Sequence, residues 1–395
     1  MTDVVVTGIS LATALGSTAK ENWQKLVAGE SAIALRQPFA DLAPGPLAMM
    51  GKYSIDLNSL LRQLVTDVCR DADIFGDREG CGEDCGVTNC GVMNCGVVIG
   101  SSRSHLQQWE RMRIAFKEIA LKEDKQTSLD WQAALPHQPA LTVAKQVGAT
   151  GPVLAPMAAC ATGVWAVAQA ADLIRSGQCQ RVIAGAVEAP ITPLTIAGFR
   201  KMGALAKTGC YPFDTEREGF VLGEGGALMV LESAQTAKER GAKIYGRVLR
   251  AGITNDSHHV SSFDPSYKMG SRALALCLER SGLSSDGMDA VHVHGTSTMQ
   301  NDRMEAYLIE KWLPPSVPIM ATKGATGHTL GASGAVIVAL SLLSLHYQTL
   351  LPCVGLKNAA YDLNFVRAAG SAQLEKVLCF SFGFGGQNAV LGLAR

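Results

Sequence analysis

Short runs of apolar residues recur along the chain, and stretches with helical patterning separate them. Runs of this kind are typical of strands buried on both faces of a sheet, which requires helices on both sides. The sequence predicts strands at 4–7, 95–100, 181–186, 226–231, 244–251, 289–294, 317–322, 376–382 and 388–393. It predicts helices at 21–28, 164–176, 271–281 and 331–347. This alternation indicates an α/β fold.

The two halves of the chain show the same mixture of elements. A chain of 395 residues is long for one typical domain, and its 47% of hydrophobic residues can supply a large core. We therefore expect two similar halves, residues 1–240 and 241–395, although their direct sequence similarity is weak.

Charge and hydropathy exclude several classes of function. The chain has 35 basic and 35 acidic side chains, and no basic cluster suited to nucleic-acid phosphates, so we expect no nucleic-acid partner. The N-terminus, MTDVVVTGIS, lacks the positive start and apolar run of a signal peptide, which favours a cytoplasmic location. The apolar run at 332–345 is too short and too interrupted by serine to cross a bilayer, so we expect no membrane association.

Four of the eleven cysteines, Cys81, Cys85, Cys90 and Cys95, lie in a short segment with a five-residue repeat. Closely spaced thiolates can bind zinc, but these spacings lack the Cys-x-x-Cys pattern of zinc knuckles. We interpret Cys81–Cys95 as a repeat expansion that runs into a strand and expect no metal there, with a metal or redox site as the alternative. Without a secretory signal, a disulfide scaffold is not expected either.

The stretch Ala158–Gly163 surrounds Cys160 with small residues and precedes a predicted helix. The partial positive charge at a helix N-terminus lowers the pKa of a thiol, and small neighbours leave room for a substrate. Cys160 is therefore a candidate nucleophile, with a buried structural cysteine as the alternative.

Two histidines, His294 and His328, lie in loops next to the ends of predicted strands and helices, where catalytic residues are common. His294 ends a predicted strand and precedes a Gly-Thr-Ser-Thr segment, whereas His292 on the same strand is interpreted as an ordinary hydrogen-bonded residue. His328 lies in the glycine-rich segment 322–334, just ahead of a helix. The positive end of that helix disfavours an imidazolium and leaves a neutral ring that can donate a hydrogen bond. A tight loop that serves only packing is the alternative for this segment.

Glycines flank Phe384 in the segment 381–388. They would let backbone N–H groups approach a reacting carbonyl, as an oxyanion hole requires. A plain glycine-rich turn is the alternative.

Taken together, these segments resemble the elongating β-ketoacyl-acyl-carrier-protein synthases I and II and their polyketide relatives, which belong to the thiolase superfamily. The matching residues follow in the order Cys160, His294, Lys323, His328 and Phe384. The segment 213–225 and the opening Val-Val-Val-Thr-Gly match as well. The resemblance implies a thiolase-like fold, a five-layered αβαβα sandwich of two related halves, and a homodimer.

The resemblance also implies a reaction. Cys160 would take an acyl group from an acyl carrier protein, while His294 and His328 would hydrogen-bond the malonyl thioester carbonyl and promote decarboxylation. Lys323 would organise the site. The backbone N–H groups of Cys160 and Phe384 would hold the tetrahedral oxyanion, and Phe384 would also gate the acyl pocket.

Three hydroxyl residues complete the implied site. Thr296 and Thr298 match residues that contact a phosphopantetheine arm, and Ser261 is expected to supply a third hydroxyl. The implied partner is an acyl carrier protein, whose phosphopantetheine carries the substrates, and no separate cofactor is implied.

The chain departs from the family pattern in three places. Ile337 stands where a glutamate partner of Lys323 is expected, so the lysine is predicted to lack that partner. Arg103 falls at or near the floor of the acyl pocket, which favours a short or polar primer or a specialised carrier. The loop 204–212 is shorter than in the housekeeping enzymes.

Two other readings of the sequence stay open. A partner subunit like the chain-length factors, possibly in a heterodimer with a second ketosynthase-like chain, would explain Ile337 and Arg103 but does not need Cys160. A thiolase would need a second cysteine, for which Cys379 is the candidate by position although it lacks the Cys-x-Gly context.

Overall fold

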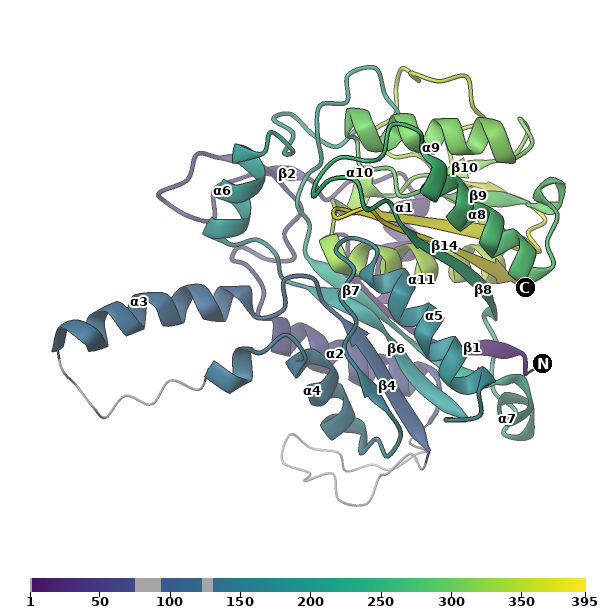
Figure 1. Cartoon of the computed structure of the whole chain (residues 1–395), viewed down its shortest axis with the longest axis horizontal. Helices are drawn as coiled ribbons and strands as arrows, with labels where there is room; N and C mark the ends of the chain where they lie inside the picture. Colours follow the sequence, from purple (N-terminus) through teal and green to yellow (C-terminus); the bar gives the residue numbers. More distant parts are fainter. Residues whose placement is uncertain (1, 75–93, 123–130) are drawn as a thin grey trace.

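The computed structural model describes residues 2–74, 94–122 and 131–395 of the chain (Figure 1). Its strands are β1 (Val4–Thr13), β2 (Ala34–Arg36), β3 (Gly45–Leu47), β4 (Cys95–Gly100), β5 (Val153–Leu154), β6 (Arg181–Glu188), β7 (Gly225–Ser233), β8 (Gly246–Asn255), β9 (Ala290–His292), β10 (Ile319–Met320), β11 (Thr349–Leu350), β12 (Gly370–Ser371), β13 (Lys376–Gly383) and β14 (Gln387–Ala394). Its α-helices are α1 (Ala19–Val27), α2 (Leu57–Asp71), α3 (Leu106–Lys122), α4 (Gln138–Val147), α5 (Thr162–Arg175), α6 (Pro193–Lys201), α7 (Ala234–Glu239), α8 (Lys268–Ser281), α9 (Met299–Trp312), α10 (Lys323–Thr326) and α11 (Ser333–Tyr347). Short 3-10 helices are η1 (Trp131–Ala134), η2 (Ser285–Gly287) and η3 (Leu330–Ala332).

Two related halves share one mixed sheet. Among the described residues its strand order is β10-β9-β13-β14-β8-β1-β7-β6-β4-β5. Outward from the centre, the first half runs β1, β7, β6, β4 and β5, and the second half runs β8, β14, β13, β9 and β10. In chain order these are the first, fifth, fourth, second and third of the five strands that each half contributes. The parallel and antiparallel pairings also match between the halves. The prediction of two related halves is therefore confirmed.

The halves meet where the first strand of each pairs with the other. Strands β1 and β8 are antiparallel, with Val4 opposite Val248 and Val6 opposite Gly246. The predicted division at residues 240 and 241 falls between the end of α7 and the start of β8. As a domain boundary it stays a prediction.

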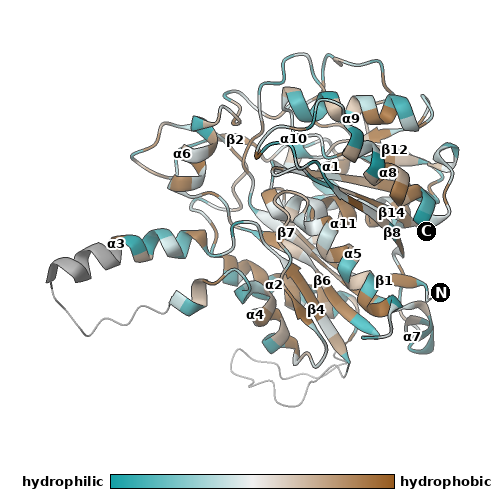
Figure 2. Cartoon of the chain, viewed as in Figure 1, coloured by the Kyte–Doolittle hydropathy of each residue, from teal (hydrophilic) through white to brown (hydrophobic). Residues whose placement is uncertain are grey.

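Helices cover both faces of each half. Helices α5 and α11 pack against each other and against strands of both halves, so they form the central layer (Figure 1). On the outer faces, α2 and α4 cover the first half and α8 covers the second. This arrangement is the expected αβαβα sandwich, and it explains why β1, β4, β6 and β14 are buried along nearly their whole length. Figure 2 shows the hydrophobic residues of these strands, most plainly in β4.

The central helix α11 corrects one sequence expectation. The helical segment Leu330–Tyr347 is long and apolar enough to cross a membrane by length and composition. The prediction that it is too short was therefore wrong. Because 89% of this segment is buried inside the protein, its apolar character is that of a core helix.

The predicted elements form close to their expected places, and β4 has the predicted bounds. Strand β1 continues past Thr7 to Thr13, because its residues from Gly8 onward pair with β7. Thr7 lies at the register shift between Val6 and Gly8, and its hydroxyl donates to the Glu232 carboxylate on β7 at 2.7 Å. Residues Cys81, Cys85 and Cys90 of the repeat lie outside the described residues.

Replacing Gly163 should destabilise the fold. Gly163 is the second residue of α5, and a Cβ at this position would lie 2.1 Å from the backbone nitrogen of Ala335 in α11. Because backbone cannot move aside cheaply, we expect Gly163→Ala to lower the free energy of unfolding by about 1–3 kcal/mol. Urea denaturation followed by circular dichroism measures this.

The matched control is Gly198→Ala in α6, where no atom lies within 4 Å of the added Cβ. Alanine is the better helix former, so stability should be unchanged or up to about 1 kcal/mol higher. Equal stability of the two variants would show that the α5–α11 contact does not constrain the fold.

Candidate active site

Cys160 lies in a strained turn directly before α5. Ala159 adopts the left-handed backbone region, with φ of 47°, which costs energy for a residue with a side chain. The Thr162 hydroxyl closes the turn, since it accepts from the Ala158 N–H at 2.8 Å and donates to the Ala159 carbonyl at 2.6 Å. The turn directs Cys160 into a cavity ahead of the helix.

Burial raises the pKa of the Cys160 thiol to about 11, which corrects the expected lowering at a helix N-terminus. Desolvation of the thiolate outweighs the positive charges of Lys323 and Arg103, which act in the opposite direction. The resting residue is therefore a thiol that must lose its proton when it attacks.

The backbone N–H of Phe384 faces Cys160 and favours its thiolate, so it acts against the rise in the pKa of this thiol. Phe384 follows β13, and the next two residues, Gly385 and Gly386, have φ of 79° and 73°. This conformation needs glycine, and it turns the chain into β14 while leaving the Phe384 amide pointing at the thiol. The glycine-rich turn therefore has a structural and a functional reason.

His294 is held from the back by two buried groups. The Glu305 carboxylate accepts from the N–H groups of His294 and Gly295, both at 2.6 Å. The Lys323 ammonium donates to the His294 carbonyl and lies 3.3 Å from its Nδ1. Because Nδ1 accepts from the ammonium, the ring proton is on Nε2, on the opposite side of the ring.

His328 packs edge-to-face against two rings, with centroid distances of 5.2 Å to both His294 and Phe220. Burial and the charge of Lys323 hold the pKa of both histidines well below the ordinary value. Both rings are therefore neutral, as expected, although the main cause is burial.

The three reactive side chains converge. Sulfur of Cys160 and ring nitrogens of His294 and His328 all lie within 4.8 Å of one another. Such spacing could also suit a metal ion, but the Lys323 ammonium against His294 disfavours a second cation there.

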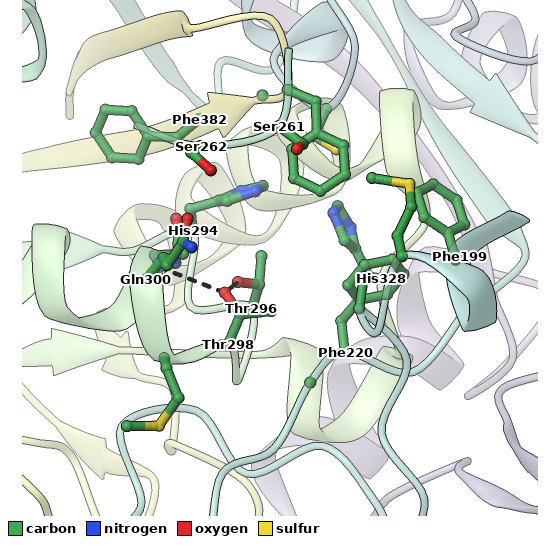
Figure 3. A pocket seen from close by; sticks show the side chains of 18 of the residues that line it. Phe199, Phe220, Ser261, Ser262, His294, Thr296, Thr298, Gln300, His328 and Phe382 are labelled. Atoms are coloured by element: carbon green, nitrogen blue, oxygen red, sulfur yellow. Dashed lines mark hydrogen bonds between the residues drawn. The ribbon is translucent and has the colours of Figure 1, made fainter. Parts of the chain in front are cut away.

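These residues line a cavity of about 370 Å³ (Figure 3). The cavity also includes Phe384, Ser261, Thr296 and Thr298, and the last two hydroxyls are hydrogen-bonded to each other at 2.9 Å (Figure 3). Seven of the nine predicted site residues therefore share one cavity. The other two, Lys323 and Arg103, are not among its lining residues: Lys323 is buried behind His294, and Arg103 packs over Phe199.

Glu305 is a buried residue of the site that the sequence analysis missed. It lies on α9, fully buried, and its carboxylate also accepts from the side-chain amide of Asn301 at 2.7 Å. Burial raises the pKa of Glu305 and lowers that of Lys323, and the charge of each opposes the shift of the other. The one feature of the sequence that could have indicated Glu305 is its position as an acidic residue in the helix that follows Thr298, on the face that is buried.

Ile337 lies in the apolar core on α11, so the expected glutamate partner of Lys323 is absent there. Glu305 supplies the nearby negative charge in its place. Lys323 therefore lacks the glutamate expected on α11, as predicted, and the acid that acts on it electrostatically lies on α9.

His292 has the ordinary role predicted for it: its ring hydrogen-bonds Ser341 at 2.9 Å and Thr322 at 3.0 Å. Cys379 is buried on β13, where its thiol donates to Ser341 at 3.3 Å, and it does not line the cavity. The second cysteine of a thiolase therefore has no counterpart among the residues lining the described cavity.

These contacts equip the cavity for acyl transfer to a thiol and for holding an enolate between neutral donors, the chemistry of a condensing enzyme with a thiolase-like fold. Two family models match the chain: "Beta-ketoacyl synthase, N-terminal domain" over residues 82–237 and "Beta-ketoacyl synthase, C-terminal domain" over residues 245–357. The chain belongs to the beta-ketoacyl synthase family.

A similar protein agrees with this assignment, and two solved structures agree with the fold. The chain is 31% identical, over 410 residues, to 3-oxoacyl-acyl-carrier-protein synthase 2 of Mycobacterium tuberculosis (strain ATCC 25618 / H37Rv), covering 99% of this chain and 97% of the relative. A type II PKS ketosynthase solved with its acyl-carrier protein, AntDE:AntF, superposes with a TM-score of 0.86 at 24% identity, covering 100% of this chain and 99% of that one. The ketosynthase ApeO, solved with its chain length factor ApeC from Xenorhabdus doucetiae, gives 0.83 at 23% identity, covering 100% and 98%.

Removing the charge of Lys323 should slow the chemistry of Cys160. Because the ammonium stabilises the thiolate, Lys323→Met raises the pKa of the thiol further and leaves less thiolate. At about pH 8 we expect iodoacetamide to alkylate Cys160 about 3- to 10-fold more slowly than in the wild type. Mass spectrometry of the Cys160 peptide measures the rate.

The control for this experiment is Lys201→Met, at the exposed end of α6, which should alkylate at the wild-type rate. If Lys323→Met alkylates as fast as this control, the ammonium does not act on the thiol.

Proposed function

We propose that the protein condenses an acyl group held on Cys160 with malonyl-acyl-carrier protein to give a β-ketoacyl-acyl-carrier protein, in fatty-acid or polyketide synthesis. One observation carries the proposal: Cys160, His294 and His328 meet within 4.8 Å in a single cavity. A nucleophile and two neutral donors are what this reaction needs, and the relatives named for it span the whole chain.

The first half-reaction uses the thiol. Cys160 loses its proton and its sulfur attacks the acyl thioester of the carrier protein, whose thiol leaves with a proton. The tetrahedral oxyanion accepts from the backbone N–H groups of Cys160 and Phe384, and its collapse leaves a thioester on Cys160. The position of the Phe384 N–H, which faces Cys160 and favours its thiolate, supports this assignment.

The second half-reaction uses the imidazoles. The malonyl thioester carbonyl accepts hydrogen bonds from His294 and His328, the electron pair of the breaking carbon–carbon bond moves into the enolate, and carbon dioxide leaves. The enolate carbon then attacks the Cys160 thioester and expels the thiolate. Lys323 keeps the proton of His294 on Nε2, the nitrogen able to donate.

The partner in this proposal is an acyl carrier protein, and the reaction takes place in the cytoplasm. The hydroxyls of Thr296, Thr298 and Ser261 line the cavity and can hydrogen-bond the amides of a phosphopantetheine arm. No cofactor besides this carried group enters the proposed steps.

Separate assays of acylation and of condensation distinguish the role of Cys160 from that of His328. A radiolabelled acyl-carrier-protein thioester should label the wild type, and Cys160→Ala should take up no label. His328→Ala should still be labelled but should form β-ketoacyl product about 100-fold or more slowly after malonyl-carrier protein is added, because the enolate loses a donor. Thin-layer or mass analysis of the carrier-bound products measures both steps.

The alternatives predict different products. A chain-length-factor-like subunit would form product only after a second ketosynthase chain is added, and a thiolase would accept acetyl-coenzyme A as its sole extender. Labelling that persists in Cys160→Ala would contradict the main proposal.

We further propose that the protein works as a homodimer that pairs through the edge strand β5. On its outer side β5 faces no other described strand. Leu154 and Met157, in and next to it, are 36% and 68% exposed. An unpaired edge with exposed apolar side chains is well suited to pairing with a second copy.

Met157→Arg should therefore shift the protein towards the monomer, because a charge would be buried at the contact. Analytical ultracentrifugation measures the change. Ile244→Arg, just before β8 at the opposite side of the first half, is the exposed control and should keep the wild-type mass. A monomeric wild type, or a dimer unchanged by Met157→Arg, would argue against this interface.

A further inference from the structure

The side chain of Asn301, in the first turn of α9, joins two buried carboxylates. Its amide nitrogen donates to a Glu305 oxygen at 2.7 Å and to an Asp302 oxygen at 3.2 Å. Asn301 is 3% exposed, and the two acids are fully buried. Because the oxygens of an ionised carboxylate can only accept, the nitrogen of the amide must be the atom that faces both acids.

The carboxamide oxygen of Asn301 has no hydrogen-bond partner among the described residues. An unpaired buried acceptor costs stability, whereas a hydrogen bond to a charged group is stronger than one between neutral groups. Both hydrogen bonds of this side chain go to the acids. Its contribution to the site is therefore that of a donor to two carboxylates.

Glu305 in turn holds the backbone and the cation next to a reactive ring. Its carboxylate accepts from the N–H groups of His294 and of the residue that follows, and its charge favours the ammonium of Lys323. That ammonium lies 3.3 Å from Nδ1 of His294. A change at Glu305 therefore reaches the His294 ring along two routes, through its own backbone and through Lys323.

The two carboxylates repel each other. Burial raises the pKa of Asp302 to about 6, and the donors that oppose this rise include the Phe213 N–H and the Asn301 amide. Burial also raises the pKa of Glu305, and the negative charge of Asp302 raises it further. A donor that bridges both carboxylates stabilises their charged forms together. Asn301 therefore favours the state in which both acids are ionised.

We propose that Asn301 is a positioning residue for the condensation: its amide holds the Glu305 carboxylate in place, and Glu305 holds His294 in the orientation that donates to the malonyl carbonyl. The proposal rests on the proposed function and adds a residue to its second half-reaction. Without the amide, Glu305 takes up a proton at a higher pH, and the backbone N–H groups at His294 then lose their charged acceptor.

The other titratable groups that face the two acids come from several elements, and they are Lys323, His294, Arg217, Cys210 and Tyr361. Burial raises the pKa of Cys210 to about 12 and also raises that of Tyr361, so both keep their protons. His294 is neutral, and a guanidinium is always charged. Burial lowers the pKa of Lys323, which loses its proton as the pH rises and so limits the rate on the alkaline side. The acid limb of a pH profile therefore reports the two carboxylates.

The test is the pH dependence of condensation in the full-length protein. Cys160 is first acetylated from acetyl-carrier protein, malonyl-carrier protein is then added at about pH 5.5–9, and mass spectrometry gives the single-turnover rate. The active form needs the carboxylate, so the rate falls as the pH falls through the pKa of Glu305. Asn301→Leu is similar in size but has no donor, so we expect its acid limb to lie about one pH unit higher.

Gln300→Leu is the matched control, because it removes an amide from the neighbouring residue, which is exposed and lines the same cavity (Figure 3). It should keep the wild-type acid limb, whatever its effect on KM. Asn301→Ser is smaller and keeps one hydroxyl donor, so its limb should move in the same direction by a smaller amount. Acetylation of Cys160 shows that each variant is folded.

Acid limbs that coincide in the wild type, Asn301→Leu and Asn301→Ser overturn the proposal, as does an equal displacement in Gln300→Leu. A lower rate at every pH with an unmoved limb indicates a merely structural role and overturns it too. Each of these results leaves the condensation standing. A wild type that forms no β-ketoacyl product at any pH would overturn the proposed function itself.

Discussion

The site depends on the close contact between the first turns of α5 and α11. Gly163 is the second residue of α5, and Gly334 is the second residue of α11. A Cβ on Gly334 would lie 2.7 Å from the Val164 nitrogen, and one on Gly163 would meet Ala335 still closer. The two helices belong to equivalent positions in the two halves, and without side chains at the crossing their N-termini lie against each other. Cys160 precedes one helix and His328 precedes the other, so this contact brings the nucleophile to a donor.

Burial then sets the electrostatics of the site. It raises the pKa of Cys160 and keeps both histidines neutral. It also disfavours the charged forms of Lys323 and Glu305. A buried charge is stable only when neighbouring groups offset its desolvation. For the Glu305 carboxylate these groups include two backbone amides, which donate hydrogen bonds to it. The site is therefore arranged for hydrogen-bond donation from neutral rings, and the Lys323 ammonium is held behind His294.

The departures from the family pattern acquire physical explanations in the fold. Ile337 extends an apolar helix that is buried along nearly all its length, and Glu305 on a different helix supplies the negative charge near Lys323. Arg103 does not fill the cavity. It packs on the outside of Phe199, which leaves the wall aromatic and adds a positive charge behind it. Neither change removes a group that the proposed condensation needs.

The sequence by itself determined the α/β class, the places of most strands, and the residues to which we assign the proposed chemistry. These are readable because strand burial produces continuous apolar runs and because Cys160, His294, His328 and Phe384 stand in distinctive local segments. Only the tertiary structure decided that Glu305 is the acid near Lys323, that burial raises the pKa of Cys160, and that Arg103 stacks on Phe199. Each of these depends on distances and desolvation between segments far apart in the chain, and such quantities leave no periodic pattern in the sequence.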